Sequence, residues 1–315
     1  MNNGGGPSVA ICTPTYRRRA QLLELCAAVN KLEFADRPPN IQVIIVDNSP
    51  GFEMADLRDK LPSLLRWPAR LEHEPTPGLS AVRNKLLSLA EEAKVDFIAF
   101  VDDDERPRPD CLARLLARQR QSDADVVMGG VHGVLAPNAP RWLAAGGFFD
   151  SIPQPAFRGI SGAHTANVLV RREVVARTAV SFESAFALTG GEDTMFFTRL
   201  ERAGARTVQE PAAIVEEDVP PERARFAWLW RRWARTGSSE ARLVVVLQPG
   251  LASRSYLLFG GLTRLAVGLA ASVVFSPLAL FGRAEAPMSK LKTAARGLGF
   301  VRGALGSDIV EYKRS

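Results

Sequence analysis

Three apolar runs that end in polar side chains constrain this 315-residue chain more than any other feature. They are "SVAICTP" (residues 8–14), "IQVIIVDNS" (41–49) and "VDFIAFVDDD" (95–104). Near-continuous apolar runs are typical of parallel strands that are covered by helices on both faces. The segments "RRAQLLELCAAVNKLE" and "GLSAVRNKLLSLAEEA", which lie between the runs, have the apolar spacing of such helices. This order predicts a doubly wound α/β sheet.

Further strands and helices are predicted as far as residue 237. A fourth strand is predicted at "ADVVMGGVHGV", and a strand leading into a helix at "TANVLVRREVVART". The segment "GGEDTMFFTRLERAG" is typical of a loop that opens a helix, which Gly204 would close. The segment "RARFAWLWRRWARTG" predicts a basic, aromatic helix.

The motifs and the positions of histidine and cysteine argue against several kinds of site. The loop "TPTYRRR" after the first run contains no glycine, which excludes the usual dinucleotide-binding and P-loop signatures. The three histidines are scattered, so no HExxH-type zinc site is expected. Three cysteines without a CxxC pair favour a reducing compartment. The start "MNNGGGPSVA" lacks the pattern of a signal peptide, so we expect the catalytic part to stay in the cytoplasm.

The C-terminal segment differs in character from the rest. Residues 255–282 are strongly apolar, and residues 265–281 form an uncharged stretch at the short limit for a membrane-spanning helix. A basic segment, "KLKTAARGLGFVRG", follows. A buried helical hairpin, a short or re-entrant span and an interfacial amphipathic anchor are all compatible with this pattern, and membrane association is favoured. We expect a catalytic domain at 1–240 and a helical, membrane-associating tail at 241–315.

Acidic residues gather where the strands end. Asp102, Asp103 and Asp104 follow the third run, and Asp47 follows the second. The carboxyl ends of parallel strands share one edge of a sheet, where ligands bind. Clustered carboxylates suit Mg²⁺ or Mn²⁺, a cation that commonly bridges a protein to a diphosphate. The alternative is that these acids only favour the N-terminal end of the following helix, which Asp110 would cap.

A second acidic pair, Glu192 and Asp193, follows two glycines that would let the backbone approach a ligand closely. A carboxylate at this point could remove a proton from a sugar hydroxyl, although an N-cap would give the same pattern. Arginines such as Arg17, Arg83 and Arg232 offer planar donors that suit phosphate oxygens, although a solvated surface role is common for any single arginine.

Five motifs in order, "CTPTYRR", "IVDNS", "GLSAVRN", "FVDDD" and "GGEDTMFFTRLERAG", together resemble the family-2 glycosyltransferases with the GT-A fold. The resemblance covers residues 8–237. The stretch "EEDVPPERARFAWLWRRWARTG" and the apolar and basic tail are similar to bacterial glucosyltransferases of succinoglycan-type exopolysaccharide assembly. The resemblance implies a Rossmann-like, mostly parallel sheet flanked by helices, followed by a helical, membrane-associating extension.

The same resemblance implies an inverting hexosyltransferase that uses a divalent metal, Mn²⁺ or Mg²⁺. Its donor would be a UDP-sugar, with UDP-glucose as a candidate, and its acceptor a lipid-linked oligosaccharide at the cytoplasmic face of a bacterial inner membrane. Asp193 would be the catalytic base, with Glu192 on the acceptor side. The metal ligands would be Asp102, Asp104 and Glu216. The nucleotide-sugar would contact Thr13, Pro14, Thr15, Arg17, Asp47, Arg83, Asp102, Asp103 and Arg232.

The sequence departs from the family pattern at three positions, which limits the residue roles that the resemblance implies. Met195 stands where relatives often have a second aspartate, so an acceptor contact would differ. Glu216 stands where many relatives have a metal-binding histidine. Leu229 replaces the glutamine of the processive QxxRW motif, which favours the addition of a single sugar.

Two other classes compete with this interpretation. A metal-dependent nucleotidyltransferase of sugar metabolism would also use clustered aspartates, but it usually carries a glycine-rich loop after the first strand. The net charge of +6 would suit a nucleic-acid binder, but the basic residues are dispersed and no aromatic RNA-binding motif is present, so no nucleic-acid partner is expected.

Overall fold

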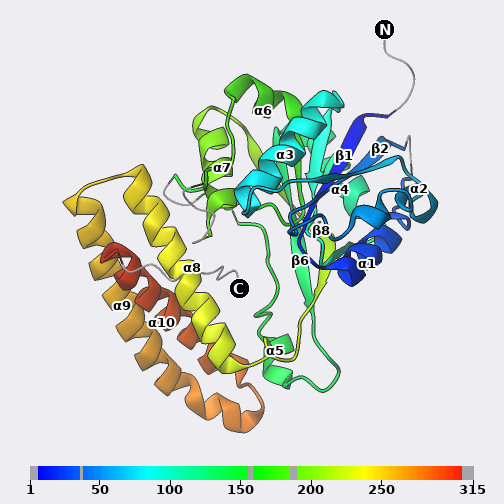
Figure 1. Ribbon diagram of the computed structural model, residues 1–315. Helices are drawn as coiled ribbons and strands as arrows, with labels where there is room; N and C mark the ends of the chain where they lie inside the picture. The colour runs from blue at the N-terminus through cyan, green and yellow to red at the C-terminus, as the bar shows by residue number, and fades with distance from the viewer. Residues whose placement is uncertain (1–5, 36–37, 155, 157–158, 185–189, 307–315) are drawn as a thin grey trace. The chain divides into compact units, whose positions relative to one another are not determined.

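The structure, a computed structural model, describes residues 6–35, 38–154, 156, 159–184 and 190–306 (Figure 1). The strands of this part are β1 (Ser8–Thr15), β2 (Asn40–Asp47), β3 (Ala69–His73), β4 (Phe97–Phe100), β5 (Glu105–Pro107), β6 (Val126–Val134), β7 (Val168–Arg171) and β8 (Thr207–Asp218). The helices are α1 (Arg19–Val29), η1 (Ala55–Leu57), α2 (Leu61–Leu64), α3 (Leu79–Glu92), α4 (Cys111–Ser122), α5 (Arg141–Ala145), α6 (Arg172–Thr178), α7 (Glu192–Arg202), α8 (Phe226–Leu247), α9 (Leu251–Phe275), η3 (Ser276–Phe281) and α10 (Glu285–Ala304).

The eight strands form one sheet in the order β3-β2-β1-β4-β7-β6-β8-β5. Strands β3, β2, β1 and β4 pair in parallel, with Val9 opposite both Ile41 of β2 and Phe97 of β4. Strand β7 pairs antiparallel with β4 and β6, and β5 pairs antiparallel with β8. The predicted Rossmann-like α/β fold is confirmed, and the sheet is mixed, with a parallel half and an antiparallel half, where a mostly parallel sheet was predicted.

Two hydrophobic cores cover the two faces of the sheet. Val9 and Ile11 of β1 face the core that includes side chains of α1 and α4. Ala10 and Cys12 face the core that includes side chains of α3, α6 and α7. The pleat directs successive side chains to opposite faces, so both must be apolar when both faces are covered. This is why the strand sequences are continuously apolar rather than alternating.

Compactness divides the chain into two units. The first comprises the described residues within 1–132, 151–187 and 192–217, and the second those within 133–150, 188–191 and 218–315. The first unit contains nearly all of the sheet. Helix α8 belongs to the second unit and runs through residue 240, where the sequence predicted a domain boundary.

Within the second unit, α10 packs along both α8 and α9, as Figure 1 shows for the yellow, orange and red helices. By length and composition alone, one segment of the described residues, Leu251–Phe281, could cross a membrane. Only a small share of its most apolar window is buried. A hydrophobic cluster of the second unit contains Leu229 and Trp233 of α8 together with side chains of α5 and α10.

Candidate active site

The three aspartates lie in the turn that joins β4 to β5. The Asp102 backbone N–H donates a hydrogen bond to Glu105 Oε2 at 2.9 Å, and the Glu105 N–H donates to the Asp102 carbonyl at 3.2 Å. These two bonds close the turn and fix the carboxylates at the carboxyl end of β4, the parallel strand that borders the antiparallel half of the sheet. Glu105, itself buried, adds a fourth acidic group to the cluster.

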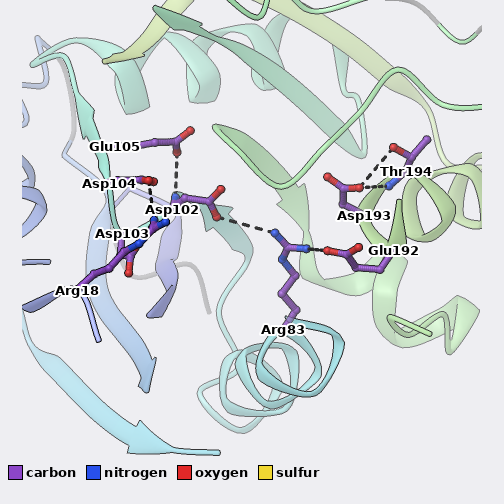
Figure 2. Close-up of polar contacts among 9 residues, drawn as sticks. All are labelled: Arg18, Arg83, Asp102, Asp103, Asp104, Glu105, Glu192, Asp193 and Thr194. Atoms are coloured by element: carbon purple, nitrogen blue, oxygen red, sulfur yellow. Dashed lines mark hydrogen bonds and ion pairs between the residues drawn. The ribbon is translucent and has the colours of Figure 1, made fainter. Parts of the chain in front are cut away.

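Arg18, between β1 and α1, relieves part of the repulsion among these carboxylates. Its Nη1 donates to Asp103 Oδ1 at 3.0 Å and to Asp104 Oδ2 at 2.6 Å (Figure 2). Thr15, the last residue of β1, donates its hydroxyl to Asp103 Oδ2 at 2.8 Å. The end of β1 and the acidic turn are therefore joined by charge-assisted hydrogen bonds, which are stronger than neutral ones.

Arg83 connects the acidic turn with the start of α7. Its Nη1 lies 2.5 Å from Glu192 Oε1, and its Nη2 lies 3.9 Å from Asp102 Oδ1 (Figure 2). The Arg83 and Glu192 side chains are each only 5% exposed. Arg83 lies in the first turns of α3, which begins after Gly78, and the Gly78 N–H donates to the Asn48 side chain at 3.1 Å. The end of β2 thereby helps to position the arginine.

Burial raises the pKa values of several carboxyl groups in this cluster. It raises the pKa of Glu192 to about 7, although the neighbouring Arg83 opposes the shift. It also raises the pKa of Asp103 to about 6 and outweighs the effect of Arg18. The pKa of Asp102 is raised by burial and by the charges of Asp104 and Asp193, against the effect of Arg83. Six carboxylates and two arginines thus leave an excess of negative charge in a poorly solvated site.

Asp193 lies on the first turn of α7 and is partly exposed. Its Oδ1 accepts a hydrogen bond from the Thr194 backbone N–H at 2.7 Å (Figure 2). The two preceding glycines have φ of 74° and 93°, a conformation that other residues rarely adopt. Because the charge of Asp193 contributes to the raised pKa of Asp102, the two acidic motifs act on one another electrostatically.

The remaining predicted residues at the strand ends are buried. Thr13 is fully buried, and its hydroxyl has no hydrogen-bond partner within the part of the chain that the structure describes. Pro14 follows it on β1, opposite Val46 of β2. Asp47 is also fully buried, and its carboxylate accepts hydrogen bonds from the Ser49 backbone N–H at 2.9 Å and from the Ser49 hydroxyl at 2.6 Å.

Three predicted site residues contact residues that are not members of this cluster. Arg17 forms an exposed ion pair with Glu53 at 2.9 Å. Glu216 of β8 pairs with Arg108 at 2.9 Å. Arg232 belongs to the second unit, where its guanidinium lies 5.3 Å from the centre of the Trp228 ring.

The side chains present fit a divalent cation. Asp102 and Asp104 carry hard oxygen donors, and both are partly accessible, with 33% and 26% of their side chains exposed. The described residues contain no group of three or more metal-ligating side chains that converge on one point. Magnesium is often held by one or two carboxylates together with substrate phosphates, so two aspartates suffice. The excess negative charge of the cluster favours the same cation.

Arg18 and Glu105 were not predicted as site residues. The signal for Arg18 was present in the run "RRR", but nothing in the sequence distinguished it from Arg17. Burial raises the pKa of Glu105 well above its usual value, and Glu217 of β8, which stands opposite it in the β5–β8 ladder, adds to the shift. Thus Glu217, rather than Glu216, faces Glu105.

The family is shown by two comparisons. The Glycosyl transferase family 2 model matches residues 10–178, and the Glycosyl transferase family group 2 model matches residues 97–288. A fold with clustered aspartates at the strand ends, together with these matches, identifies the class: the chain is a glycosyltransferase and belongs to family 2. The nucleotidyltransferase alternative is not favoured.

Individual proteins that are similar to this chain give more detail than the family models. The succinoglycan biosynthesis protein ExoM of Rhizobium meliloti (strain 1021) is 34% identical over 243 residues, which cover 77% of this chain and 76% of that protein. The mannosyltransferase PcManGT from Pyrobaculum calidifontis, solved in complex with GDP-Man and Mn²⁺, has a TM-score of 0.61 at 18% identity and covers 95% of this chain and 88% of its own.

A second solved structure has the same fold. S. aureus TarS 1-349 in complex with UDP has a TM-score of 0.51 at 16% identity, covering 91% of this chain and 90% of its own. At this level of identity both structural matches indicate the fold alone, here the GT-A fold.

Proposed function

We propose that this enzyme transfers one hexose from a UDP-sugar, with UDP-glucose as the first candidate, to a lipid-linked oligosaccharide in surface or exopolysaccharide biosynthesis. The observation that carries the proposal is the position of Arg83 between Asp102 and Glu192, two acidic motifs that are 90 residues apart in the chain. A transferase needs a group that holds the donor diphosphate close to a group that activates the acceptor, and Arg83 joins the candidates for these two tasks.

Asp193 is the proposed general base. A carboxylate on the first turn of a helix, partly exposed and beside a glycine loop, can approach an acceptor hydroxyl. It would take the hydroxyl proton while that oxygen attacks the anomeric carbon from the side opposite the diphosphate, which inverts the configuration. Glu192 points to Arg83 and would keep that arginine oriented during the reaction.

The donor is proposed to lie over the ends of β1, β2 and β4. Thr13, Pro14, Thr15 and Asp47 lie at these strand ends, where the buried Thr13 hydroxyl makes no hydrogen bond to the described residues. Asp103 and Arg83 would face the nucleotide-sugar from the acidic turn and from α3. Contacts from Arg17 and Arg232 would require these side chains to leave the partners they have here.

Asp102 and Asp104 would hold a divalent cation, Mn²⁺ or Mg²⁺, with Glu216 as a further predicted ligand. Such a cation neutralises negative charge on the departing diphosphate. Arg18 already neutralises Asp103 and one oxygen of Asp104, which leaves Asp102 as the less compensated carboxylate. The Pyrobaculum calidifontis mannosyltransferase, which has the same fold, was solved with Mn²⁺, and this supports the proposal.

The solved relatives support a nucleotide-sugar donor but differ in the base. One TarS structure contains UDP and another UDP-GlcNAc, whereas the mannosyltransferase contains GDP-Man. The name of the ExoM relative supports a role in exopolysaccharide synthesis. We further propose that residues 1–240 act as the catalytic domain and that residues 241–315 associate with the cytoplasmic face of the inner membrane.

The test is nucleotide release by the purified full chain across a panel of UDP-sugars and GDP-Man, with Mn²⁺, Mg²⁺ or EDTA. We expect metal-dependent release of UDP from one sugar even with water as the acceptor. Release should be abolished in Asp104→Ala but retained in Asp110→Ala, a control that removes an exposed acid near the site. Release from GDP-Man alone would contradict the UDP assignment, and UDP binding that is indifferent to the metal would contradict the metal site.

A further inference from the structure

The outer face of α9 is an exposed apolar surface. Its exposed residues are almost all apolar, with side chains such as Phe259 (73% exposed) and Val274 (73% exposed). The face consists of Phe259, Leu262, Thr263, Ala266, Val267, Ala270, Val273 and Val274, which recur at helical spacing. It continues into η3, where Leu280 and Phe281 are 87% and 79% exposed.

The two charges of this segment are turned away from that face. The Arg254 guanidinium donates to the Ala304 carbonyl of α10 at 2.8 Å. The Arg264 guanidinium lies 4.9 Å from the centre of the Phe300 ring, also on α10. The hydroxyl of Thr263, the polar exception on the face, donates to the Phe259 carbonyl at 2.8 Å. The outer face therefore offers apolar surface without charges or unsatisfied donors.

Basic residues border the apolar face. Arg283, directly after η3, is 68% exposed, and the Lys290 ammonium lies 4.9 Å from the centre of the Phe275 ring. Residues 226–304 contain eleven basic and two acidic residues, a net charge of +9, whereas the whole chain has +6. An apolar strip with a cationic border is complementary to a bilayer that contains anionic lipids.

Packing against α10 determines the orientation that such a helix can take in a bilayer. A Cβ at Gly268 would lie 2.6 Å from the Ala294 backbone nitrogen, and one at Gly261 would lie 2.8 Å from the Gly297 carbonyl, so the two backbones are in close contact. Helix α9 alone, about 37 Å long, could cross a bilayer. It would draw α10 in with it, and α10 carries one acidic and four basic residues. Each such charge is costly in hydrocarbon.

We propose that α9 and η3 form a docking surface for an anionic lipid bilayer, in which α9 lies parallel to the membrane plane with its outer face in the headgroup region. This proposal rests on the membrane association proposed above and specifies its mode. It does not depend on the donor or the acceptor, because vesicle binding can be measured without sugars and UDP release can be measured without vesicles.

The first experiment measures partitioning of the full chain onto phosphatidylcholine vesicles with and without phosphatidylglycerol. We expect binding to the anionic vesicles that weakens with salt. Phe259→Gln with Val274→Gln should lower the partition coefficient at least tenfold, since each side chain loses apolar burial. Ile152→Gln, which changes an apolar residue of the first unit that is 63% exposed, should leave binding unchanged and serves as the matched control.

A separate experiment tests the basic residues that border the apolar face. Neutralising Arg283 or Lys290 with glutamine should weaken binding to anionic vesicles about fivefold per residue and leave binding to neutral vesicles unchanged. Arg120→Gln, on an exposed position of α4, is the control. All variants change surface side chains, and unaltered UDP release would show that they remain folded.

The second experiment measures insertion depth with spin labels at Ser255→Cys, Thr263→Cys and Ala270→Cys, each exposed on α9. The native cysteines are all buried, so labelling is confined to the introduced positions. A parallel helix gives one similar, shallow depth at all three sites. A deep middle with shallow ends would mean that α9 spans the bilayer, and a face that binds a second copy of the chain instead of vesicles would equally overturn the proposal.

Discussion

The acidic site and the α9–α10 hairpin hold their elements together by opposite means. In the site, elements are joined by buried charges, as in the contact of Arg83 with Glu192, and the pKa of Glu192 is raised because burial outweighs that contact. In the hairpin, close backbone contact joins the elements, since Gly261 and Gly297 let two backbones touch, and two arginine contacts between α9 and α10 add to it. The site therefore keeps charged groups in poorly solvated positions that its chemistry needs, whereas the hairpin depends mainly on the close fit of its backbones.

The sharpest test of this contrast is Asp193→Asn, which should affect chemistry and leave the fold intact. Removing a positioned base should lower kcat for UDP release by about 10²- to 10⁴-fold, while the denaturation midpoint stays close to that of the parent. Asp59→Asn, an exposed acid of the same unit, is the control. A variant within threefold of the parent would rule out Asp193 as the base.

The next largest effect is expected for Arg83→Met. It leaves a buried carboxylate without its partner, and the free energy of unfolding at pH 7 should fall by about 3–5 kcal/mol in urea denaturation. Arg83→Met with Glu192→Gln should recover part of that loss, because no charge is then left unpaired. Arg18→Met is the matched control: Arg18 is 41% exposed, so it should cost less than half as much. Equal losses for the two arginines would refute the role of burial.

The pH dependence of stability tests the raised pKa of Glu192. With a pKa of about 7 in the folded protein and 4.5 otherwise, the folded state binds more protons between these values. The free energy of unfolding should therefore fall as the pH rises from 4.5 to 7, with a contribution of about 3 kcal/mol at most from this group. Glu192→Gln should remove that part of the slope. A slope identical to the parent would contradict the shift.

The smallest expected effects concern two adjacent glycines of α9. A Cβ at Gly261 would meet backbone of α10, so Gly261→Ala should destabilise by about 1–3 kcal/mol. A Cβ at Gly260 would meet the end of the flexible Arg264 side chain at 3.1 Å and the Tyr256 ring at an ordinary 3.9 Å, so Gly260→Ala should be neutral or stabilise by about 0.5–1 kcal/mol. Equal effects in thermal unfolding would mean that the backbones are not in contact.

Much of the fold was predictable because its strands are buried on both faces. The runs at β1, β2, β4 and β6 and the strand that leads into α6 were all found, and α7 closes at Gly204 as expected. Strands β3, β5 and β8 were not predicted. β3 and β5 have only five and three residues, and β8 contains a proline and is largely half-buried, so none of them gives a continuous apolar signal.

The acidic members of the site, except Glu105, were also predictable, because ligands bind at the carboxyl ends of parallel strands and at loops beside them. Their partners were not. Arg18 and Asp103 are 85 residues apart, and Arg83 and Glu192 are 109 apart. Of 40 basic residues, the sequence could not indicate which would meet these acids. The roles of Asp193, the metal ligands and the nucleotide-binding residues stay predictions until the experiments above are done.

The sequence by itself determined the family, the buried parallel strands and the acidic residues at their ends, because these follow from local patterns of apolar and charged side chains. Only the tertiary structure decided which arginine serves which acid, that Glu217 rather than Glu216 faces Glu105, and that the arginines of α9 turn toward α10. Such contacts depend on how distant segments pack. Packing is set by the whole chain at once, so no local pattern records it.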